Sequence, residues 1–373
     1  MDARKHICFT FAGDISRDSR LRRFASTLAD AYRVSVIALS DAPSPHLQDI
    51  DVRNIPPGHS SLRRALPAFW FHAARMAEAL RADLYVASDL YTLPAAARAA
   101  KAATAPLIYD SRELYTSIAA LRGRALTQRF WSLIERVYAP RADTLLTVNT
   151  SIADILRGRG YGHVAVVRNV ADWKAAGREN LLRSLLDIPE NVVVLLSQGG
   201  LQKGRGALPM LRAVAQVSDC ALVFLGDGPL ASDVLQHARD KGMAERVFVL
   251  PAVPSVELQR YTVSADVGIC LIEALGESYR LSLPNKLFEY LAAGLPVLAS
   301  DGPEISAVIR EAGAGISVNP ANGQAVTQAL QLLVHDRQLR GRCAENASIA
   351  AEHYTWENEK AVLLDAIRML IRP

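Results

Sequence analysis

The sequence lacks any apolar run long enough to cross a bilayer, since the longest candidates, such as VVVLLS at 192–197, have the length of a strand. Cysteine is scarce, and no two cysteines lie close together or at metal-ligand spacing, so neither a disulfide framework nor a zinc site is expected and a reducing cytoplasm fits best. The four are Cys8, Cys220, Cys270 and Cys343. The start, MDARKHICFTFAG, has no small-residue cleavage site and predicts a first strand rather than a signal peptide.

Charge is nearly balanced overall, at +4, but it divides unevenly along the chain. Residues 1–170 hold 23 Lys and Arg against 15 Asp and Glu, which leaves 19 against 23 in the remainder. A basic half can attract nucleic acid, an anionic membrane or a phosphorylated substrate, although such charges are often only solvated helix faces. No nucleic-acid-reading motif accompanies the positive charge, so no nucleic-acid partner is expected.

Short apolar strand-like runs alternate with helix-like segments from end to end. Near-continuously apolar strands separated by helices predict parallel sheets covered on both faces. A polar break at 169–176 separates two such series, and 373 residues suit two domains. We therefore expect an α/β protein with two doubly wound Rossmann-like domains, residues 1–170 and 171–355, whose ligands bind at the carboxyl ends of the strands in a cleft between them.

The segment SLPNKLFEYLAAGLPVLAS at 282–300 gives the strongest indication of a ligand site in the sequence. Ser282 or Asn285, with Pro284, predicts the start of a short helix, and Gly294 predicts its end. Free N–H groups and the positive end of the helix dipole would suit a diphosphate, and Lys286 would add charge. Glu289 would accept hydrogen bonds from ribose hydroxyls, unless this is simply an amphipathic helix with both charges exposed.

Two glycine-rich turns follow other strands of the second series. SQGGLQKGRGALP at 197–209 offers close backbone approach together with Lys203 and Arg205, but it does not match the P-loop pattern. LGDGP at 225–229 allows a tight turn without chemistry of its own. Three such segments at the same edge indicate a phosphate site more strongly than any one of them.

These segments, with RVFVLPAVPSVELQRYTVSADVGICL at 246–271, resemble glycosyltransferase family 4, whose members are retaining enzymes of the GT-B fold. DSRLRRFASTLADAYRVSVIALSD at 18–41, DLYTLPAAARAAK at 89–101 and LIYDSRELY at 107–115 are similar to N-terminal segments of that family. The resemblance covers most of the chain. It implies a nucleotide diphosphate sugar as donor, bound by the C-terminal domain, and an acceptor bound by the N-terminal one.

By that resemblance, Glu289 binds the donor ribose, Arg205 contacts the diphosphate, and the backbone of 251–253 holds the base. A final helix, about 356–373, would cross back onto the N-terminal domain. The resemblance also implies transfer by same-face attack with retention of the anomeric configuration. No metal would be needed, because the helix dipole and the basic side chains would stabilise the charge that a metal ion otherwise stabilises. The lone Asp-x-Asp pair, Asp49 and Asp51, is therefore not expected to bind a metal. The expected donor-site residues are Gly200, Lys203, Arg205, Val253, Leu283, Pro284, Asn285, Lys286 and Glu289.

Three positions depart from the family pattern. Leu281 stands where an earlier glutamate is usual, with Glu277 and Glu273 as possible substitutes, and Gly200 replaces a typical Arg. Arg112 replaces a His. Among acidic residues of the N-terminal half, Asp110, Glu113 and Asp89 are the candidates for orienting an acceptor hydroxyl, although each is equally explained as a helix cap.

Two N-terminal helix-like segments mix basic and aromatic residues, as faces that rest on an anionic membrane do. Their residues are Arg63, Arg64, Phe69, Trp70, Phe71 and Arg75 in one, and Arg122, Arg124, Arg129, Phe130, Trp131 and Arg136 in the other. Either helix taken alone is also explained by aromatic side chains in the core and arginines in solvent. Because the whole N-terminal half carries excess positive charge, we favour a cytoplasmic protein that associates peripherally with the inner face of the membrane.

The sequence predicts a glycosyltransferase that moves a hexose-type sugar to a sugar or lipid-linked acceptor, such as a cell-surface glycan precursor. Two other functions stay open. One is a nucleotide-sugar epimerase or phosphorylase, which would use a related site. The other is a catalytically weakened GT-B binding subunit, suggested by Leu281, Gly200 and Arg112.

Overall fold

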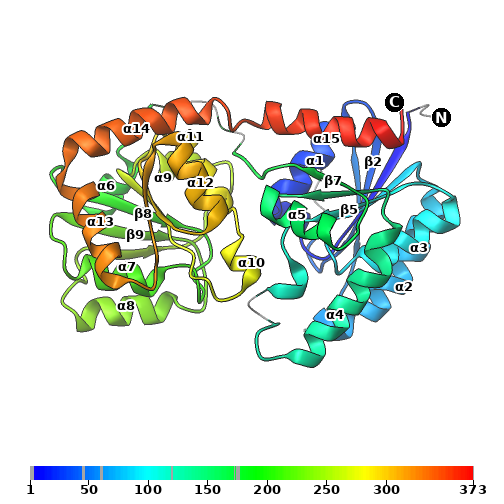
Figure 1. The fold of residues 1–373 in the computed structure, drawn as a ribbon, viewed down its shortest axis with the longest axis horizontal. Helices are drawn as coiled ribbons and strands as arrows, with labels where there is room; N and C mark the ends of the chain where they lie inside the picture. The colour runs from blue at the N-terminus through cyan, green and yellow to red at the C-terminus, as the bar shows by residue number, and fades with distance from the viewer. Residues whose placement is uncertain are drawn as a thin grey trace. The chain divides into compact units, whose positions relative to one another are not determined.

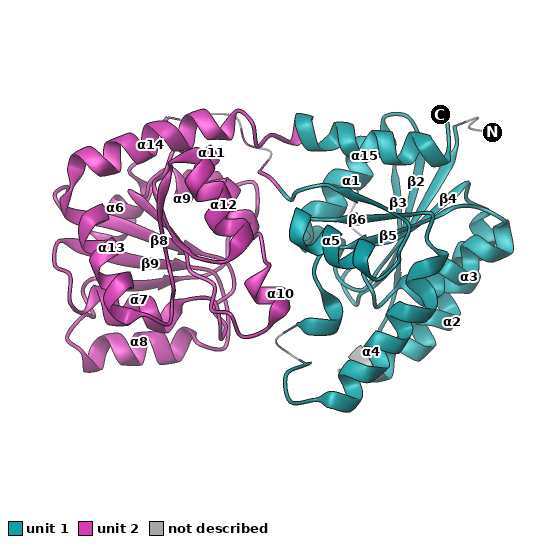
Figure 2. Ribbon diagram, in the orientation of Figure 1, with its two compact units in different colours: residues 1–169, 357–373 teal, residues 170–356 magenta. Residues whose placement is uncertain are grey.

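The computed structural model describes residues 4–43, 47–58, 62–118, 121–171, 173 and 177–372, with the backbone alone for residues 62 and 63. The chain divides into two compact units (Figure 2). Unit 1 comprises Met1–Asn169 and Glu357–Pro373, and unit 2 comprises Val170–Trp356.

Unit 1 is built on a seven-stranded parallel sheet with the order β3-β2-β1-β4-β5-β6-β7. Its strands are β1 (His6–Phe11), β2 (Arg33–Leu39), β3 (Ile50–Ile55), β4 (Leu84–Ala87), β5 (Leu107–Ser111), β6 (Thr144–Thr147) and β7 (His163–Val166). Its helices are α1 (Ser19–Ala29), α2 (Leu62–Leu80), α3 (Leu93–Ala103), α4 (Ala125–Tyr138) and α5 (Thr150–Gly158), together with α15 (Trp356–Leu370) from the C-terminus.

Unit 2 is built on a six-stranded parallel sheet with the order β10-β9-β8-β11-β12-β13. Its strands are β8 (Val193–Gln198), β9 (Cys220–Leu225), β10 (Val247–Leu250), β11 (Val267–Cys270), β12 (Val297–Ser300) and β13 (Gly315–Val318). Its helices are α6 (Leu181–Leu186), α7 (Ala207–Val214), α8 (Ala231–Asp240), α9 (Leu258–Thr262), α10 (Glu277–Arg280), α11 (Asn285–Ala292), α12 (Pro303–Ala312), α13 (Gly323–His335) and α14 (Arg337–Ala351) (Figure 1).

The burial of the strands explains why the sheets are parallel and covered by helices. Every residue of β1, β8, β9, β11 and β12 is buried, as expected of strands with packing on both faces. The predicted α/β class and the two doubly wound Rossmann-like domains are therefore confirmed.

In each sheet the strand order changes direction once, at the first strand of the unit. In unit 1 the first strand, β1, pairs with both β2 and β4, and in unit 2 β8 pairs with both β9 and β11. Loops at the carboxyl ends of the strands on either side of such a reversal form the usual ligand crevice of these folds. Each unit therefore presents one such edge.

The helix α15, red in Figure 1, belongs to unit 1 from Glu357 onward. Glu359, which is 4% exposed, attaches it to the chain beyond β7. Its carboxylate accepts a hydrogen bond from the backbone N–H of Arg168 at 2.6 Å and one from the Arg168 guanidinium at 3.1 Å. The last helix thus stabilises the segment where the chain leaves the first sheet.

Candidate functional site

In unit 2, the loops at the strand reversal are held together by glycines. A Cβ at Gly226 would clash with the carbonyl of Gly199, and one at Gly228 would clash with the carbonyl of Leu201. The N–H of Leu201 donates to the carbonyl of Asp227 at 2.9 Å. The turn after β9 is therefore packed directly on the loop after β8.

The loop after β8 enters α7 through Gly206. This glycine has φ +78°, and a Cβ there would lie 2.5 Å from the Cβ of Leu271, the residue that follows β11. Both the backbone angle and the contact require glycine. Gly200 is different, because it is exposed and a Cβ there would meet nothing closer than 3.8 Å.

The predicted short helix forms with the expected bounds. Helix α11 begins at Asn285, with Pro284 as the flanking residue, and Gly294 follows its end with φ +65°. The Ser282 hydroxyl donates to the Tyr279 carbonyl at 2.8 Å and does not cap the helix. The first turn of α11 thus presents its N–H groups at the carboxyl edge of the sheet, between β11 and β12.

Two cations meet at this edge. Lys286 is buried rather than exposed, which corrects the view of α11 as a helix with both charges in solvent. The pKa of Lys286 is lowered to about 8, mainly by burial; the charge of Arg205 also lowers it, while Cys270 and Glu289 act in the opposite direction. Within the described residues neither cation forms an ion pair, and the Nε of Arg205 is buried without a hydrogen-bond partner.

A small cavity of about 20 Å³ lies between these cations and the loop after β8. Its lining includes Ser197, Gln198, Gly199, Gly200, Arg205 and Lys286. The volume is enough for about one water molecule. Arg205 also lies over the ring of Tyr279, with 5.5 Å between guanidinium carbon and ring centre, which holds the guanidinium at the cavity.

Glu289 is held by side chains that the sequence did not indicate as functional. The amide of Gln198 donates a hydrogen bond to the Glu289 carboxylate, and the hydroxyl of Thr262 donates to the Gln198 carbonyl oxygen at 2.9 Å. The Tyr290 hydroxyl accepts from the N–H of Gln198 at 3.0 Å. The one signal for Gln198 in the sequence is its polar side chain at the end of β8, where it follows four apolar residues and Ser197.

The other donor-site candidates lie at the same edge with differing exposure. Lys203 is exposed, Leu283 is buried and Pro284 is half-buried. Val253 follows β10, and its N–H and carbonyl make no hydrogen bond to any residue that the structure describes. Its backbone is therefore available to a ligand.

The position of the usual earlier glutamate is filled by an apolar side chain. Leu281 is 3% exposed at the end of α10. Of the two proposed substitutes, Glu277 forms an ion pair with Arg280 at 2.7 Å. The N–H of Glu273 donates to the carbonyl of Gly204 at 3.0 Å, which places Glu273 beside the loop that carries Arg205; its carboxylate makes no hydrogen bond or ion pair in the described parts of the chain.

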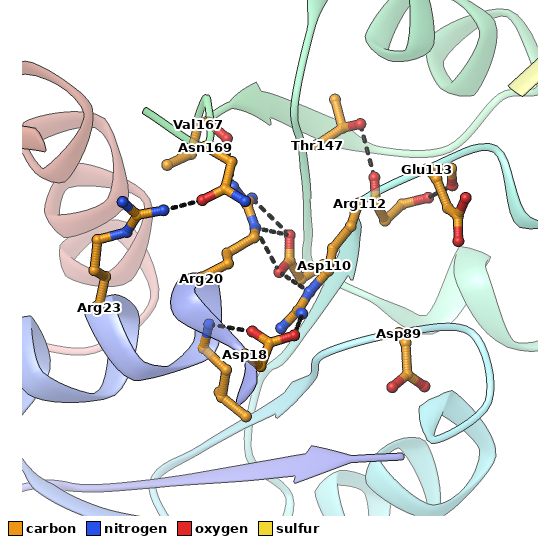
Figure 3. Close-up of polar contacts among 12 residues, drawn as sticks. Asp18, Arg20, Arg23, Asp89, Asp110, Arg112, Glu113, Thr147, Val167 and Asn169 are labelled. Carbon is orange, nitrogen blue, oxygen red and sulfur yellow. Dashed lines mark hydrogen bonds and ion pairs between the residues drawn. The ribbon is translucent and has the colours of Figure 1, made fainter. Parts of the chain in front are cut away.

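In unit 1, Asp110 lies at the centre of a buried ion-pair network (Figure 3). Its carboxylate accepts hydrogen bonds from Arg20 at 2.9 and 2.8 Å and from Arg112 at 3.1 Å. Arg20 also donates to the Val167 carbonyl at 2.6 Å. Asp110 is 1% exposed, so this geometry favours a structural role over contact with an acceptor.

Arg112, which stands in place of a histidine, is held by two carboxylates. It pairs with Asp110 and with Asp18, the N-cap of α1. Burial opposes the charge, but the carboxylates of Asp18 and Asp110 raise the pKa of Arg112 overall. A guanidinium held in this way does not act as a proton acceptor.

Asp89 accepts hydrogen bonds from backbone on both sides of the strand reversal. Its carboxylate accepts from the N–H of Thr92 at 2.8 Å and from the N–H of Ala12 at 3.1 Å. Burial raises the pKa of Asp89 to about 6, against the Ala12 hydrogen bond and the charge of Arg112. This geometry favours a structural role for Asp89, which links the ends of β1 and β4; it is not the N-cap of α3, which is Thr92. Glu113 is half-buried, and in Figure 3 its side chain lies apart from the Asp110 network.

The described residues form neither a metal-ligand cluster nor a membrane-spanning helix. Within its described residues, no group of three or more His, Cys, Asp and Glu side chains is arranged to hold a metal ion. Asp51 of the Asp-x-Asp pair forms an ion pair with Arg53 at 2.7 Å, and Asp49 has φ +59°. No helix in the described ranges combines the length and apolar character needed to span a membrane.

Family models match both halves of the chain. Residues 18–170 match the glycosyl transferase 4-like domain, and residues 180–349 match glycosyl transferases group 1. The two matched ranges include the Asp110 network and the Arg205–Lys286 site respectively.

Curated relatives include the lipopolysaccharide core biosynthesis glycosyltransferase LpsE of Rhizobium meliloti (strain 1021), 26% identical over 56% of this chain and 58% of that protein. A D-inositol 3-phosphate glycosyltransferase of Corynebacterium urealyticum is 29% identical over 64% of this chain and 59% of its own length. This chain thus matches less than two thirds of the length of either relative.

Solved structures share the whole fold at low identity. Sucrose-phosphate synthase from Thermosynechococcus elongatus superposes with a TM-score of 0.83 at 16% identity, covering 98% of this chain and 99% of that one. Anabaena HepE in complex with UDP-glucose gives a TM-score of 0.75 at 16% identity, over 97% of this chain and 100% of that one. The two parallel sheets therefore form a GT-B fold, and the chain belongs to the group 1 glycosyltransferases of family 4 type.

Proposed function

We propose that the protein transfers a hexose from a nucleotide diphosphate sugar to an acceptor, with retention of configuration. The observation that supports this most directly is the pair of cations, Arg205 and Lys286, at the strand reversal of unit 2, where the first turn of α11 adds its N–H groups. Two positive charges without ion-pair partners among the described residues, beside a helix N-terminus, are suited to a diphosphate. HepE binds UDP-glucose in its own complex, so uridine donors are tested first.

The cavity of about 20 Å³ limits which part of the donor it can take. It has room for part of one phosphate group, and the rest of the donor would lie over the open loops at the edge of the sheet. Glu289, positioned by Gln198, would accept hydrogen bonds from the ribose hydroxyls. The free backbone groups of Val253 would bind the base.

The chemical step is a substitution at the anomeric carbon. The bond from that carbon to the diphosphate oxygen breaks, the bond to the acceptor oxygen forms on the same face, and the acceptor proton passes to the leaving diphosphate. Arg205 and Lys286 would stabilise the negative charge that develops on the diphosphate. We propose that these two cations do this without a metal.

Unit 1 would bind the acceptor, and we propose a lipid-linked or other cell-surface glycan precursor. LpsE acts in lipopolysaccharide core biosynthesis, which supports an acceptor of this class. The protein would then work in the cytoplasm, at the inner face of the membrane. The exposed arginines of unit 1 support that location.

Donor binding tests the proposal. The melting temperature of the protein is measured with UDP, GDP and ADP and with their sugar conjugates. Ligands that carry one of the three bases should raise it, because a ligand that binds the native state stabilises that state. Glu289→Ala should abolish most of that shift and Glu311→Ala, an exposed control on the same unit, should leave it unchanged. The product's anomeric configuration, read by NMR, tests retention.

Two outcomes would contradict the proposal that the protein is a transferase. Absence of nucleotide binding would favour the weakened binding subunit, which the buried Leu281 suggests. An epimerised nucleotide sugar among the products would favour the epimerase.

A further inference from the structure

Helix α4 of unit 1 carries a stripe of large apolar side chains on its outer face. Leu126 is 81% exposed, Phe130 46%, Leu133 58% and Val137 41%. Their spacings of four, three and four residues place all of them on one side of the helix. These four residues are called the α4 stripe. Exposed apolar groups that adjoin in this way mark an interaction surface more often than scattered ones do.

The α4 stripe borders an apolar groove between α2 and α4. The groove has a volume of about 340 Å³, within the roughly 300–1,000 Å³ range of ligand pockets. Its walls are mainly Leu66, Pro67, Trp70, Leu126, Phe130 and Trp131. An apolar ligand that entered it would displace water from hydrocarbon and aromatic surface.

The aromatic walls of the groove are fixed from inside the protein. The indole N–H of Trp70 donates to the Tyr91 carbonyl at 2.5 Å, so its polar atom is satisfied. Trp131 packs edge-on against Tyr91, with ring centres 5.0 Å apart. The two tryptophan side chains that line the groove are therefore held in place by contacts with Tyr91.

The charge around the stripe has one sign. From 121 to 142, the exposed charged side chains are all arginines, namely Arg122, Arg124, Arg129, Arg136 and Arg141. The one acidic residue of that range, Glu135, is 2% exposed and paired with Arg159. Arg64 and Arg75 of α2 are also exposed. An apolar stripe flanked by arginines matches the surface of an anionic bilayer, whose headgroups are negative and whose interior is hydrocarbon.

We infer that the α4 stripe docks unit 1 on an anionic phospholipid bilayer and that the groove between α2 and α4 receives one hydrocarbon chain of a lipid. A second copy of the chain fits less well, because a two-fold contact through α4 would bring arginines against arginines. A nucleic acid would use the arginines but not the leucines and phenylalanine. The inference rests on the proposed function only in that the lipid would bring the acceptor to unit 1.

Vesicle co-sedimentation tests the docking surface. The full chain should sediment with vesicles of phosphatidylcholine mixed with phosphatidylglycerol, less with phosphatidylcholine alone, and less at high salt. Phe130→Ser with Leu133→Ser should lower the partition coefficient by roughly tenfold or more, since each side chain withdraws apolar area from water. Leu332→Ser with Ile349→Ser removes two exposed apolar side chains of unit 2 and should leave binding unchanged.

The same variants separate this inference from the donor site. A nucleotide-induced rise in melting temperature should be equal in wild type and in the Phe130/Leu133 variant, because the donor residues lie in unit 2. If the wild type fails to bind phosphatidylglycerol vesicles, or if the variant binds them equally well, the docking inference is overturned while the donor proposal stands. Loss of a solution dimer in the variant would overturn it in favour of self-association.

Fluorescence quenching tests the groove. A variant with Trp173→Phe and Trp356→Phe retains Trp70 and Trp131 as its tryptophans. Vesicles whose phosphatidylglycerol carries bromine on the acyl chain should quench its emission, and unbrominated vesicles should not. The converse variant, which retains Trp173 and Trp356, should show no quenching. Equal quenching of both variants, or of neither, would exclude a hydrocarbon chain in the groove.

Discussion

The burial of Lys286 carries a cost in stability that a bound diphosphate would offset. The residue is 7% exposed and lies near a second cation, Arg205. Burial of a charge without a close partner is unfavourable, and the lowered pKa records that penalty. A bound diphosphate would reverse it by supplying the missing negative charge.

Diphosphate affinity should therefore depend on pH through Lys286. Because the pKa of Lys286 in the free protein is lowered to about 8, UDP binding measured by calorimetry should weaken as pH rises through about 8. In the unfolded chain the lysine titrates near its ordinary value, so between about 8 and 10.5 the unfolded state binds more protons and stability rises with pH.

The variant Lys286→Met isolates both effects. It should weaken UDP binding at neutral pH, flatten its pH dependence near 8, and raise the free energy of unfolding of the free protein by about 1–3 kcal/mol. Lys241→Met, at an exposed lysine of the same unit that follows α8, is the control. A Lys286→Met protein that binds UDP with unchanged pH dependence would exclude Lys286 from the diphosphate site.

Gln198 should act as a positioning residue for Glu289. Gln198→Ala removes the amide that orients the carboxylate and leaves the Thr262 hydroxyl without that acceptor. We expect UDP affinity to fall by about tenfold, the equivalent of one charge-assisted hydrogen bond. Thr262→Val should give a smaller loss, since it acts one step further away. Equal affinity in Gln198→Ala and wild type, measured by calorimetry, would show that Glu289 needs no such support.

At the scale of elements, the loops after β8 and β9 depend on glycines for different reasons. Gly206 is required by its φ of +78° and by its contact with Leu271, whereas Gly200 is exposed with open space around it. Glycine at position 206 is thus required for the conformation of the loop after β8, whereas glycine at position 200 is not required by its surroundings. The resemblance to family 4 implies an arginine at the position of Gly200, and the open space around this glycine would admit one.

Gly206→Ala should destabilise unit 2 by about 2 kcal/mol or more, because the left-handed backbone and the Leu271 contact are both unfavourable for alanine. Gly200→Ala in the same loop should change stability by less than about 0.5 kcal/mol. Urea unfolding with an intrinsic probe of unit 2 measures both. A neutral Gly206→Ala would mean that the loop can move away from β11.

The bounds of α11 were predictable and the environment of its side chains was not. Pro284 and Gly294 are local signals, so the helix from Asn285 onward followed from the sequence. The burial of Lys286 depends on Arg205 and on the loop after β8, about 80 positions earlier in the chain. For the same reason the sequence does not identify Gln198 as a site residue, because its partner Glu289 is 91 positions away.

At the scale of the molecule, strand burial explains why the doubly wound fold could be predicted. A continuous apolar run has no exposed face, so it needs helices on both sides of its sheet. Ion pairs carry no such periodic signal. Arg20 and Asp110 are 90 positions apart, and nothing in DSREL indicates that the aspartate would be enclosed by two arginines rather than face an acceptor.

The two compact units should unfold separately, with each responding to its own perturbation. Asp110→Asn removes the charge shared by Arg20 and Arg112, so it should lower the melting temperature of unit 1 by the equivalent of about 3–5 kcal/mol. UDP at 100 times its dissociation constant should stabilise unit 2 by about 2.7 kcal/mol. Differential scanning calorimetry of the full chain should show two transitions, one lowered by the substitution and the other raised by UDP. Their effects should add, because the two sites share no residues. A single transition that moves with both perturbations would show instead that the units unfold as one cooperative body, and Asp110→Asn would then weaken the whole molecule rather than unit 1 alone.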